Sequence, residues 1–204
     1  YMKKVTVMSD SEIHELAETY ADYDFKPGEK SIFSVFGSRE RILRYLEMSI
    51  RTALKSGWIY SVGDNREAYI AISYSDSHPP LHIMLSFPFR AMKAVGTRLL
   101  YDLSKLLKNG GSSLADRMKK NGEKFLSVEM LCVKKEYQGK GYMRKAMEKV
   151  FRLADEKRLP VVLETDETLK ADKYRHLGME QEGVRRFTPE IAFYEMIYRP
   201  GSIL

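Results

Sequence analysis

The chain has 204 residues, of which 44% are hydrophobic and 30% charged, as is typical of a soluble globular protein. Its net charge of +6 indicates an anionic partner, whether nucleic acid, a lipid surface or a phosphorylated small molecule. The lone Cys132 and four scattered histidines exclude a disulfide framework and make a metal site unexpected. Because the sequence has neither a long apolar run nor a signal-peptide pattern, we expect a cytoplasmic protein.

The N-terminal part predicts two helices followed by a β-hairpin. Apolar residues recur at intervals of three and four from Asp10 to Tyr20, and again from Ser38 to the residues before Gly57. Both stretches are therefore expected to form amphipathic helices. Beyond Gly57, residues 58–62 and 68–74 are rich in β-branched and aromatic side chains and are separated by turn residues, so they predict a hairpin.

A helical insertion is expected next. The segment from Leu81 to Lys108 has leucines at helical spacing, Gly110 and the residues after it break the helix, and a short polar stretch leads to Lys124. Residues 80–124 are interpreted either as a lid over a binding site or as packing helices without a ligand role.

The C-terminal part predicts a strand, a helix and a second strand. A nearly continuous apolar strand from Phe125 to Val133 leads through a polar corner to a helix whose apolar stripe runs from Met143 to Ala154. Val161 begins a second buried strand, so the unit is expected to be a right-handed parallel crossover. The remaining expected elements are a short helix ending at Gly178 and strands over residues 179–184 and 191–199.

The turn between that strand and helix has the features of an anion site. A strand that enters a glycine turn at the start of a helix directs backbone N–H groups and the positive end of the helix dipole outward. Gly139 and Gly141 would let the backbone approach a pyrophosphate, and Lys140 and Arg144 add charge. A plain turn is the alternative. The run matches neither a P-loop nor a full Rossmann fingerprint, so neither an NTPase nor a dehydrogenase is indicated.

Two motifs resemble one known family. The run Leu131-Cys132-Val133-Lys134-Lys135-Glu136-Tyr137-Gln138-Gly139-Lys140-Gly141 resembles the central motif of the GNAT superfamily of acetyl-CoA-dependent N-acetyltransferases. Tyr174-Arg175-His176-Leu177-Gly178-Met179 resembles the Tyr-x-x-Leu-Gly-Phe segment that follows it in that family. The two motifs cover roughly the C-terminal third of the chain.

The resemblance implies an α/β fold in which helices flank a mixed central β-sheet. We expect one acetyltransferase domain over residues 1–204, with the helical insertion at about 80–124 before the central strand and a cofactor-binding core at about 125–200. In this family the acceptor is bound mainly by N-terminal helices and variable connections, which here are the segments 24–36 and 75–124.

The resemblance also implies the chemistry, in which an acetyl group moves from acetyl-CoA to a primary amine by direct attack in a ternary complex without a metal. Strand residues would pair with the pantetheine arm, and the N–H groups from Gln138 through Arg144 would hold the pyrophosphate. The implied cofactor-binding residues are Leu131, Cys132, Val133, Gln138, Gly139, Lys140, Gly141, Tyr142, Met143 and Arg144.

Two side chains are candidates for proton transfer. Tyr174 lies where the family has a tyrosine that protonates the departing thiolate of coenzyme A, although a packing role is the alternative. A base is needed because an alkylammonium group, with a pKa of ~10.4, is mostly protonated at neutral pH. Glu129 is the candidate base, and strand alternation predicts it on the same face as Leu131 and Val133. A structural carboxylate, Glu164 on the adjacent strand and a water relay are alternatives.

Some residues depart from the family pattern. Met143 stands where Gly or Ala is usual, Met179 replaces a Phe, and Lys170 stands where an Asn often contacts the cofactor. The departures at Met143 and Lys170 favour the alternative of a non-catalytic acyl-CoA-binding or sensor domain. A nucleic-acid-binding module is suggested only by the basic charge.

The expected partners are acetyl-CoA and an amine, without nucleic acid or membrane, in a monomer or homodimer. The amine is left open among a small amine, an antibiotic, a polyamine and a protein lysine.

Overall fold

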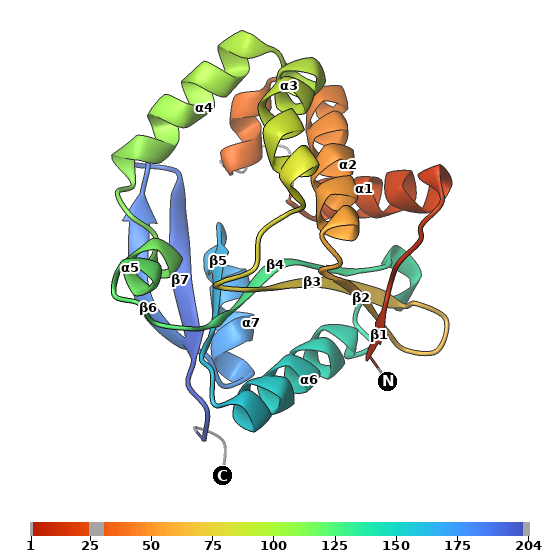
Figure 1. Ribbon diagram of the computed structural model, residues 1–204, viewed down its shortest axis with the longest axis vertical. Coiled ribbons are helices and arrows are strands. Elements are labelled where there is room, and N and C mark those ends of the chain that lie inside the picture. Colours follow the sequence, from red (N-terminus) through yellow and green to blue (C-terminus); the bar gives the residue numbers. More distant parts are fainter. Residues whose placement is uncertain (1, 25–30, 202–204) are drawn as a thin grey trace.

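A computed structural model describes residues 2–24 and 31–201 as one mixed β-sheet with helices on both faces (Figure 1). The strands of the described residues lie in the order β1-β2-β3-β4-β5-β7-β6, and all neighbours except β4 and β5 are antiparallel. Their bounds are Met2–Lys4 (β1), Ile59–Val62 (β2), Ala68–Tyr74 (β3), Leu126–Val133 (β4), Val161–Thr165 (β5), Glu180–Arg186 (β6) and Ala192–Tyr198 (β7).

Helices connect these strands and cover the sheet. Their bounds are Asp10–Asp24 (α1), Arg39–Lys55 (α2), Leu81–Val95 (α3), Thr97–Asn109 (α4), Leu114–Lys120 (α5), Tyr142–Lys157 (α6) and Thr168–His176 (α7), with 3₁₀ turns at Ile32–Phe36 (η1) and Lys135–Tyr137 (η2). The Ser38 side chain caps α2 by accepting a hydrogen bond from the Arg41 N–H at 3.3 Å. Among the described residues, the helices are too short or too polar to cross a membrane.

The structure confirms the α/β class and corrects several element boundaries. The single helix expected from Leu81 to Lys108 is wrong, because Gly96, at φ 87°, separates α3 from α4. The polar stretch before Lys124 contains α5, whose N-terminus is held by a capping box between Ser113 and Asp116. The short strand β1 and the turn η1 were not predicted.

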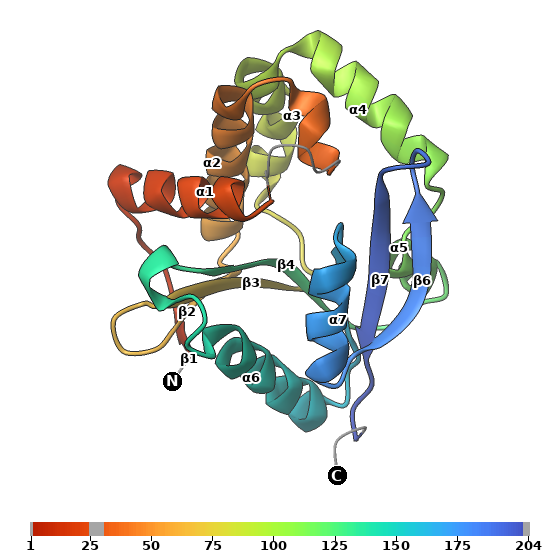
Figure 2. The same cartoon turned by 180° about the vertical axis from the view of Figure 1, so that it is seen from behind.

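The central feature of the sheet is a gap between β4 and β5. These parallel strands pair only at their beginnings, where Leu126 lies opposite Val161 and Ser127 opposite Val162. The expected crossover is present, since α6 connects the two strands and lies against the sheet (Figure 2). Beyond Ser127 the edge of β4 that faces β5 is no longer paired with it.

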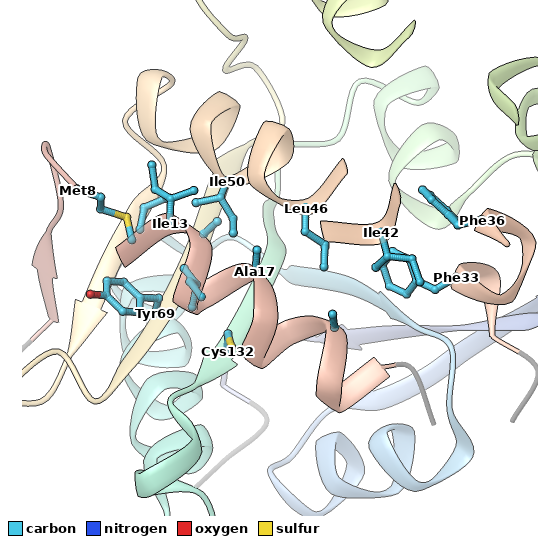
Figure 3. Packing of buried hydrophobic residues seen from close by; sticks show 14 of the residues in the cluster. Met8, Ile13, Ala17, Phe33, Phe36, Ile42, Leu46, Ile50, Tyr69 and Cys132 are labelled. Carbon is cyan, nitrogen blue, oxygen red and sulfur yellow. The ribbon is translucent and has the colours of Figure 1, made fainter. Parts of the chain in front are cut away.

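The two faces of the sheet carry separate cores. On one face α6 and α7 pack against residues such as Ile70, Val128 and Leu163. On the other face α1 and α2 pack against Tyr69 and Cys132. Figure 3 shows this second core, with α1 lying between α2 and the two labelled residues of the sheet. A smaller cluster on the same side joins α5 to β5 and β7.

Candidate functional site

A cavity of about 740 Å³ lies at the gap between β4 and β5. Its residues come from both faces of the sheet, so the gap connects the α6 and α7 side with the α1 and α2 side. On the α6 and α7 side it is lined by Tyr137, Gln138, Gly139, Gly141, Tyr142, Met143, Lys170, Lys173 and Tyr174. On the other side it is lined by Thr19, Tyr20, Ile32, Phe33, Phe36, Tyr45, Leu103, Leu107 and Phe193.

Most of the sequence-predicted site residues line this cavity. Residues from β4 and the glycine turn come together with Tyr174 of α7 and Glu129 of β4. Lys140 and Arg144 are exposed and do not line it. On the other side, η1 and α4 fall within the expected acceptor segments 24–36 and 75–124, of which residues 25–30 lie outside the described residues. The residues that line this side from α1 and α2 were not expected there.

The glycine turn leaves room above its backbone. Gly139 and Gly141 have φ values of 75° and 79°, a conformation that favours glycine, and a Cβ built on either would meet nothing within 4 Å. The backbone bonding of α6 begins with Lys145 N–H donating to the Gly141 carbonyl at 3.0 Å. The N–H groups of the preceding first turn therefore face outward at the positive end of the helix dipole.

Two N–H groups of the expected cradle are already used within the turn. Gln138 N–H donates to the Lys135 carbonyl at 3.4 Å, and Lys140 N–H donates to the Tyr137 carbonyl at 3.3 Å. The Gln138 side chain donates to the Val133 carbonyl at 3.2 Å, which ties the turn to the end of β4. These bonds leave the N–H groups of the two glycines and of the first turn of α6 as the available donors.

A buried carboxylate is hydrogen-bonded to the first residue of α6, directly after the glycine turn. Tyr142 donates from its hydroxyl to Glu67 at 3.2 Å, and Asn65 N–H donates to the other oxygen of Glu67 at 2.9 Å. Burial raises the pKa of Glu67, but hydrogen bonds from backbone N–H groups and from Tyr142 outweigh it and hold the pKa below its ordinary value. The first residue of α6 is thereby anchored to the β2–β3 hairpin.

The predicted orientation of Glu129 is wrong. Ala71 pairs with Met130 and Ile72 with Val128, so Glu129 is the extra residue of a β-bulge in β4. A bulge breaks the alternation of side chains along the strand. Ser73 donates to Glu129 Oε1 at 2.6 Å.

Strand β3 has no bulge, so its side chains alternate regularly and show on which face of the sheet the Glu129 carboxylate lies. Its residues Ile70 and Ile72 pack on the α6 side, so Ser73 points to the α1 side. The Glu129 carboxylate therefore lies on the α1 side, opposite Leu131 and Val133, which pack on the α6 side. It lines the cavity and is exposed.

Glu164, the alternative base, is held in an ion pair. Arg185 Nη1 donates to its two oxygens at 2.8 and 3.0 Å, and the same guanidinium donates to the carbonyls of Gly110 and Gly111 at 3.3 and 2.8 Å. Burial raises the pKa of Glu164, against the opposing effect of Arg185. Arg185 thus links the connection between α4 and α5 to the sheet beside the cavity.

The remaining predicted residues lie on α6 and α7. Tyr174 is half-buried and lines the cavity from α7. Lys170, one turn earlier, lines it too and is paired with Asp166 at 3.2 Å and Glu167 at 3.8 Å. Met143 is half-buried in the first turn of α6 and also lines the cavity. The described residues contain no cluster of three or more potential metal ligands.

A family model matches the part of the chain that contains the glycine turn and Tyr174. Residues 94–178 match the model of the acetyltransferase (GNAT) family, a range that includes α4, β4, the glycine turn, α6, β5 and α7. Among curated proteins, no sequence matches this chain.

Solved structures share the fold. A Pyrococcus horikoshii OT3 protein is similar over 98% of both chains, with a TM-score of 0.60 and 15% identity. Arylalkylamine N-acetyltransferase 2 of Aedes aegypti is similar over 98% of both chains, with a TM-score of 0.59 and 14% identity. A polyamine N-acetyltransferase of Drosophila melanogaster is similar over 98% of this chain and 99% of its own, with a TM-score of 0.55 and 15% identity. At these identities the similarity shows the fold.

Proposed function

We propose, because residues 94–178 match the model of the acetyltransferase (GNAT) family, that the protein transfers an acetyl group from acetyl-CoA to a primary amine in a ternary complex. The observation that carries the proposal is the cavity at the gap between β4 and β5, which joins the glycine turn on one face of the sheet to an acceptor pocket on the other. Transfer between ligands bound on opposite faces requires such a passage.

The cofactor end of the cavity is suited to a long anionic thioester. The pyrophosphate would accept hydrogen bonds from the outward N–H groups at Gly139, Gly141 and the first turn of α6. The pantetheine arm would lie along the edge of β4 that β5 leaves unpaired, at Leu131, Cys132 and Val133. Lys140 and Arg144 would add positive charge at the solvent-exposed rim.

The chemical step uses two side chains that line the cavity. The amine enters as an ammonium and gives a proton to the Glu129 carboxylate, directly or through water. Its nitrogen lone pair then attacks the thioester carbonyl carbon, and backbone N–H groups near Leu131 stabilise the tetrahedral oxyanion. The carbon–sulfur bond breaks, and the thiolate of coenzyme A takes the proton of the Tyr174 hydroxyl. The nitrogen loses its second proton, which restores the Tyr174 hydroxyl through solvent, and Glu129 releases the first proton to solvent.

We further propose that the whole chain acts as one acetyltransferase domain. The single sheet supports this, because β3 of the N-terminal part pairs with β4 along its whole length. The helical insertion at about 80–124 and the core at about 125–200 are held together by Arg185 and by Arg117, which donates to Glu195 of β7 at 2.8 Å.

The test combines thioester consumption with cofactor binding. Release of coenzyme A from acetyl-CoA would be followed with a panel of primary amines, and binding of acetyl-CoA would be measured by calorimetry. Gly139→Val should weaken acetyl-CoA binding by at least ~tenfold, because the new side chain fills the space above the turn.

Gly122→Val is the matched control. Gly122 has a φ of 74° and equally open surroundings, but it follows α5 and does not line the cavity. Both variants should lose a similar ~1 kcal/mol of stability from the strained backbone. Equal binding by the two variants would contradict the cofactor site. Binding without coenzyme A release, with any amine, would favour a non-catalytic acyl-CoA-binding domain instead.

A further inference from the structure

We infer that the acceptor is a primary monoamine with an aromatic or similarly bulky apolar body. It would bind in the acceptor half of the cavity, which is the part lined by α1, η1, α2, α4 and β7, with Glu129 of β4 and Glu164 of β5 beside the gap. The inference rests on the proposed function, because it names the substrate class of the same site.

One wall of the acceptor half is a continuous row of aromatic rings. Tyr20 of α1 contacts Phe33 of η1 edge-to-face with the ring centroids 6.5 Å apart. Phe33 contacts Phe36 at 5.5 Å, and Phe36 contacts Tyr45 of α2 edge-to-face at 5.2 Å. All four side chains line the cavity. Such a wall favours a planar apolar group, which gains both hydrophobic burial and further ring contacts.

The rest of the acceptor half is also mainly apolar. Leu103 and Leu107 line it from α4, Phe193 lines it from β7, and Ile32 lines it from η1. Leu103 is buried, whereas Leu107 is 40% exposed and therefore lies at the rim. The polar atoms of its described side chains away from the gap are the hydroxyls of Thr19, Tyr20 and Tyr45, and the Thr19 hydroxyl donates to the Glu15 carbonyl at 2.9 Å. An amine with a charged body would lose hydration against these mainly apolar walls.

Charge in the acceptor half is confined to the floor beside the gap. Three described carboxylates line the cavity at the gap, namely Glu129, Glu164 and Asp166, and the two cations that line it, Lys170 and Lys173, come from α7. Asp166 is paired with Lys170 at 3.2 Å. Glu164 is paired with Arg185, whereas the hydrogen-bond partner of Glu129 is the neutral Ser73. Glu129 is thus the carboxylate positioned to bind an ammonium group, and it does so next to the passage to the cofactor half.

This arrangement accommodates one positive charge. A diamine or polyamine whose first nitrogen lies at Glu129 would place its next ammonium against the aromatic and leucine walls, where no described carboxylate would receive it. A peptide lysine would bring backbone amides to the same apolar walls. The structure therefore favours an apolar monoamine over both of these classes.

The first experiment compares kcat/KM for 2-phenylethylamine, 1,4-diaminobutane, spermidine and a lysine-containing peptide at saturating acetyl-CoA. We expect 2-phenylethylamine to be preferred by at least ~tenfold. Equal or reversed preference would overturn the inferred substrate class while leaving acetyl transfer intact. Acetylation of none of these amines, together with calorimetric binding of 2-phenylethylamine alone, would refute the transfer reaction and support the apolar amine site. Neither acetylation nor binding of 2-phenylethylamine would overturn the inference.

The second experiment adds a carboxylate to the apolar rim. Leu107→Glu should shift the kcat/KM ratio of 1,4-diaminobutane to 2-phenylethylamine upward by about tenfold, because the second ammonium then has a partner. Tyr101→Glu is the matched control, since Tyr101 lies on the same helix, is 67% exposed and does not line the cavity. An unchanged ratio in Leu107→Glu, or an equal shift in both variants, would contradict the assignment of this wall to the acceptor.

Discussion

The side chains proposed to move protons reach the cavity from different elements. Tyr174 comes from α7 on one face of the sheet, and Glu129 reaches the other face through the bulge in β4. Because of the bulge, the proposed base and the proposed acid lie on opposite faces of the sheet. A thioester carbonyl in the gap would lie between them, as an acid and a base acting on opposite sides of one reaction centre require.

Removing the Tyr174 hydroxyl tests whether this residue is the general acid. Tyr174→Phe keeps the ring that packs against the α6 side of the sheet, so the fold and acetyl-CoA binding should change little. The rate should fall by about 10²-fold or more, because the departing thiolate loses its proton donor. Measured kcat alongside the Kd of acetyl-CoA separates the two effects. An unchanged kcat in this variant would show that Tyr174 is not the general acid.

The two candidate bases can be separated by the pH dependence of the rate. Glu129→Gln should displace the limb of kcat/KM that rises toward alkaline pH to higher pH, because the amide cannot accept the ammonium proton and only amine already deprotonated in solution can react. Glu164→Gln should preserve that limb, since Arg185 holds Glu164 in an ion pair. A parental profile in Glu129→Gln together with a displaced limb in Glu164→Gln would reverse the assignment. Parental profiles in both would favour a water relay.

The residues of the glycine turn could be predicted from the sequence, but the orientation of the Glu129 side chain could not. Glycines with positive φ at a strand–helix turn leave a pattern in the sequence, as Gly139 and Gly141 do. The bulge at Glu129 leaves none, because it depends on how β4 pairs with β3 and shifts every later side chain by one position. Of the aromatic wall, Phe33 and Phe36 lie in the expected acceptor segment 24–36, whereas Tyr20 and Tyr45 come from two other elements and were missed.

At the scale of elements, the beginning of α1 is held by a reciprocal capping interaction. Glu12 N–H donates to the Ser9 hydroxyl at 3.1 Å, and Ser9 N–H donates to the Glu12 carboxylate at 2.8 Å. Arg66 of the β2–β3 turn adds an ion pair to Glu12 at 2.9 Å. Ser9→Ala should therefore lower the free energy of unfolding by about 1 kcal/mol, measured by urea titration.

The charge of Glu12 makes part of this stability depend on pH. The Ser9 N–H bond holds the pKa of Glu12 below its ordinary value, with smaller help from Arg66 and against burial. A lowered folded-state pKa contributes stability that is present above the unfolded pKa and is lost as the pH falls through the folded pKa. Glu12→Gln should thus be less stable than the parent near neutral pH, and the difference should disappear in acid. A difference independent of pH would contradict this.

Helix α5 is attached to β7 through a buried carboxylate. Glu195 is 2% exposed, accepts from Leu114 N–H at 2.6 Å and pairs with Arg117 at 2.8 Å. Arg117→Met leaves that carboxylate short of donors and should cost about 2 kcal/mol of stability by urea titration. Lys119→Met, an exposed change on the same helix, should cost less than about 0.5 kcal/mol. Equal losses would mean that Arg117 acts only through surface charge.

Local patterns predicted most elements, and long-range contacts decided the others. The amphipathic helices α1, α2 and α6 and the hairpin of β2 and β3 have periodicities that appear within one segment. The break at Gly96 and the capping of α5 were missed because a continuous row of leucines outweighed the local glycine and serine signals. β1 has three residues and exists through pairing with β2, which no pattern within it indicates.

At the scale of the whole molecule, α4 connects the N-terminal helices to the last strands of the sheet. It follows α3, which packs on α2, and its last residue, Asn109, donates to the Phe187 carbonyl beyond β6 at 3.4 Å (Figure 1). The acceptor half of the cavity therefore lies between the N-terminal helices and the last strands. A site assembled from segments so distant in sequence cannot be predicted from any one of them.

The passage through the sheet has a consequence for steady-state kinetics. Since the two proposed ligands contact different residues on opposite faces, double-reciprocal plots should intersect, and coenzyme A should compete with acetyl-CoA but not with the amine. Parallel lines would instead indicate an acetylated enzyme. Cys132, which lines the passage with its side chain packed beneath α1, would then be the residue to search for the modification.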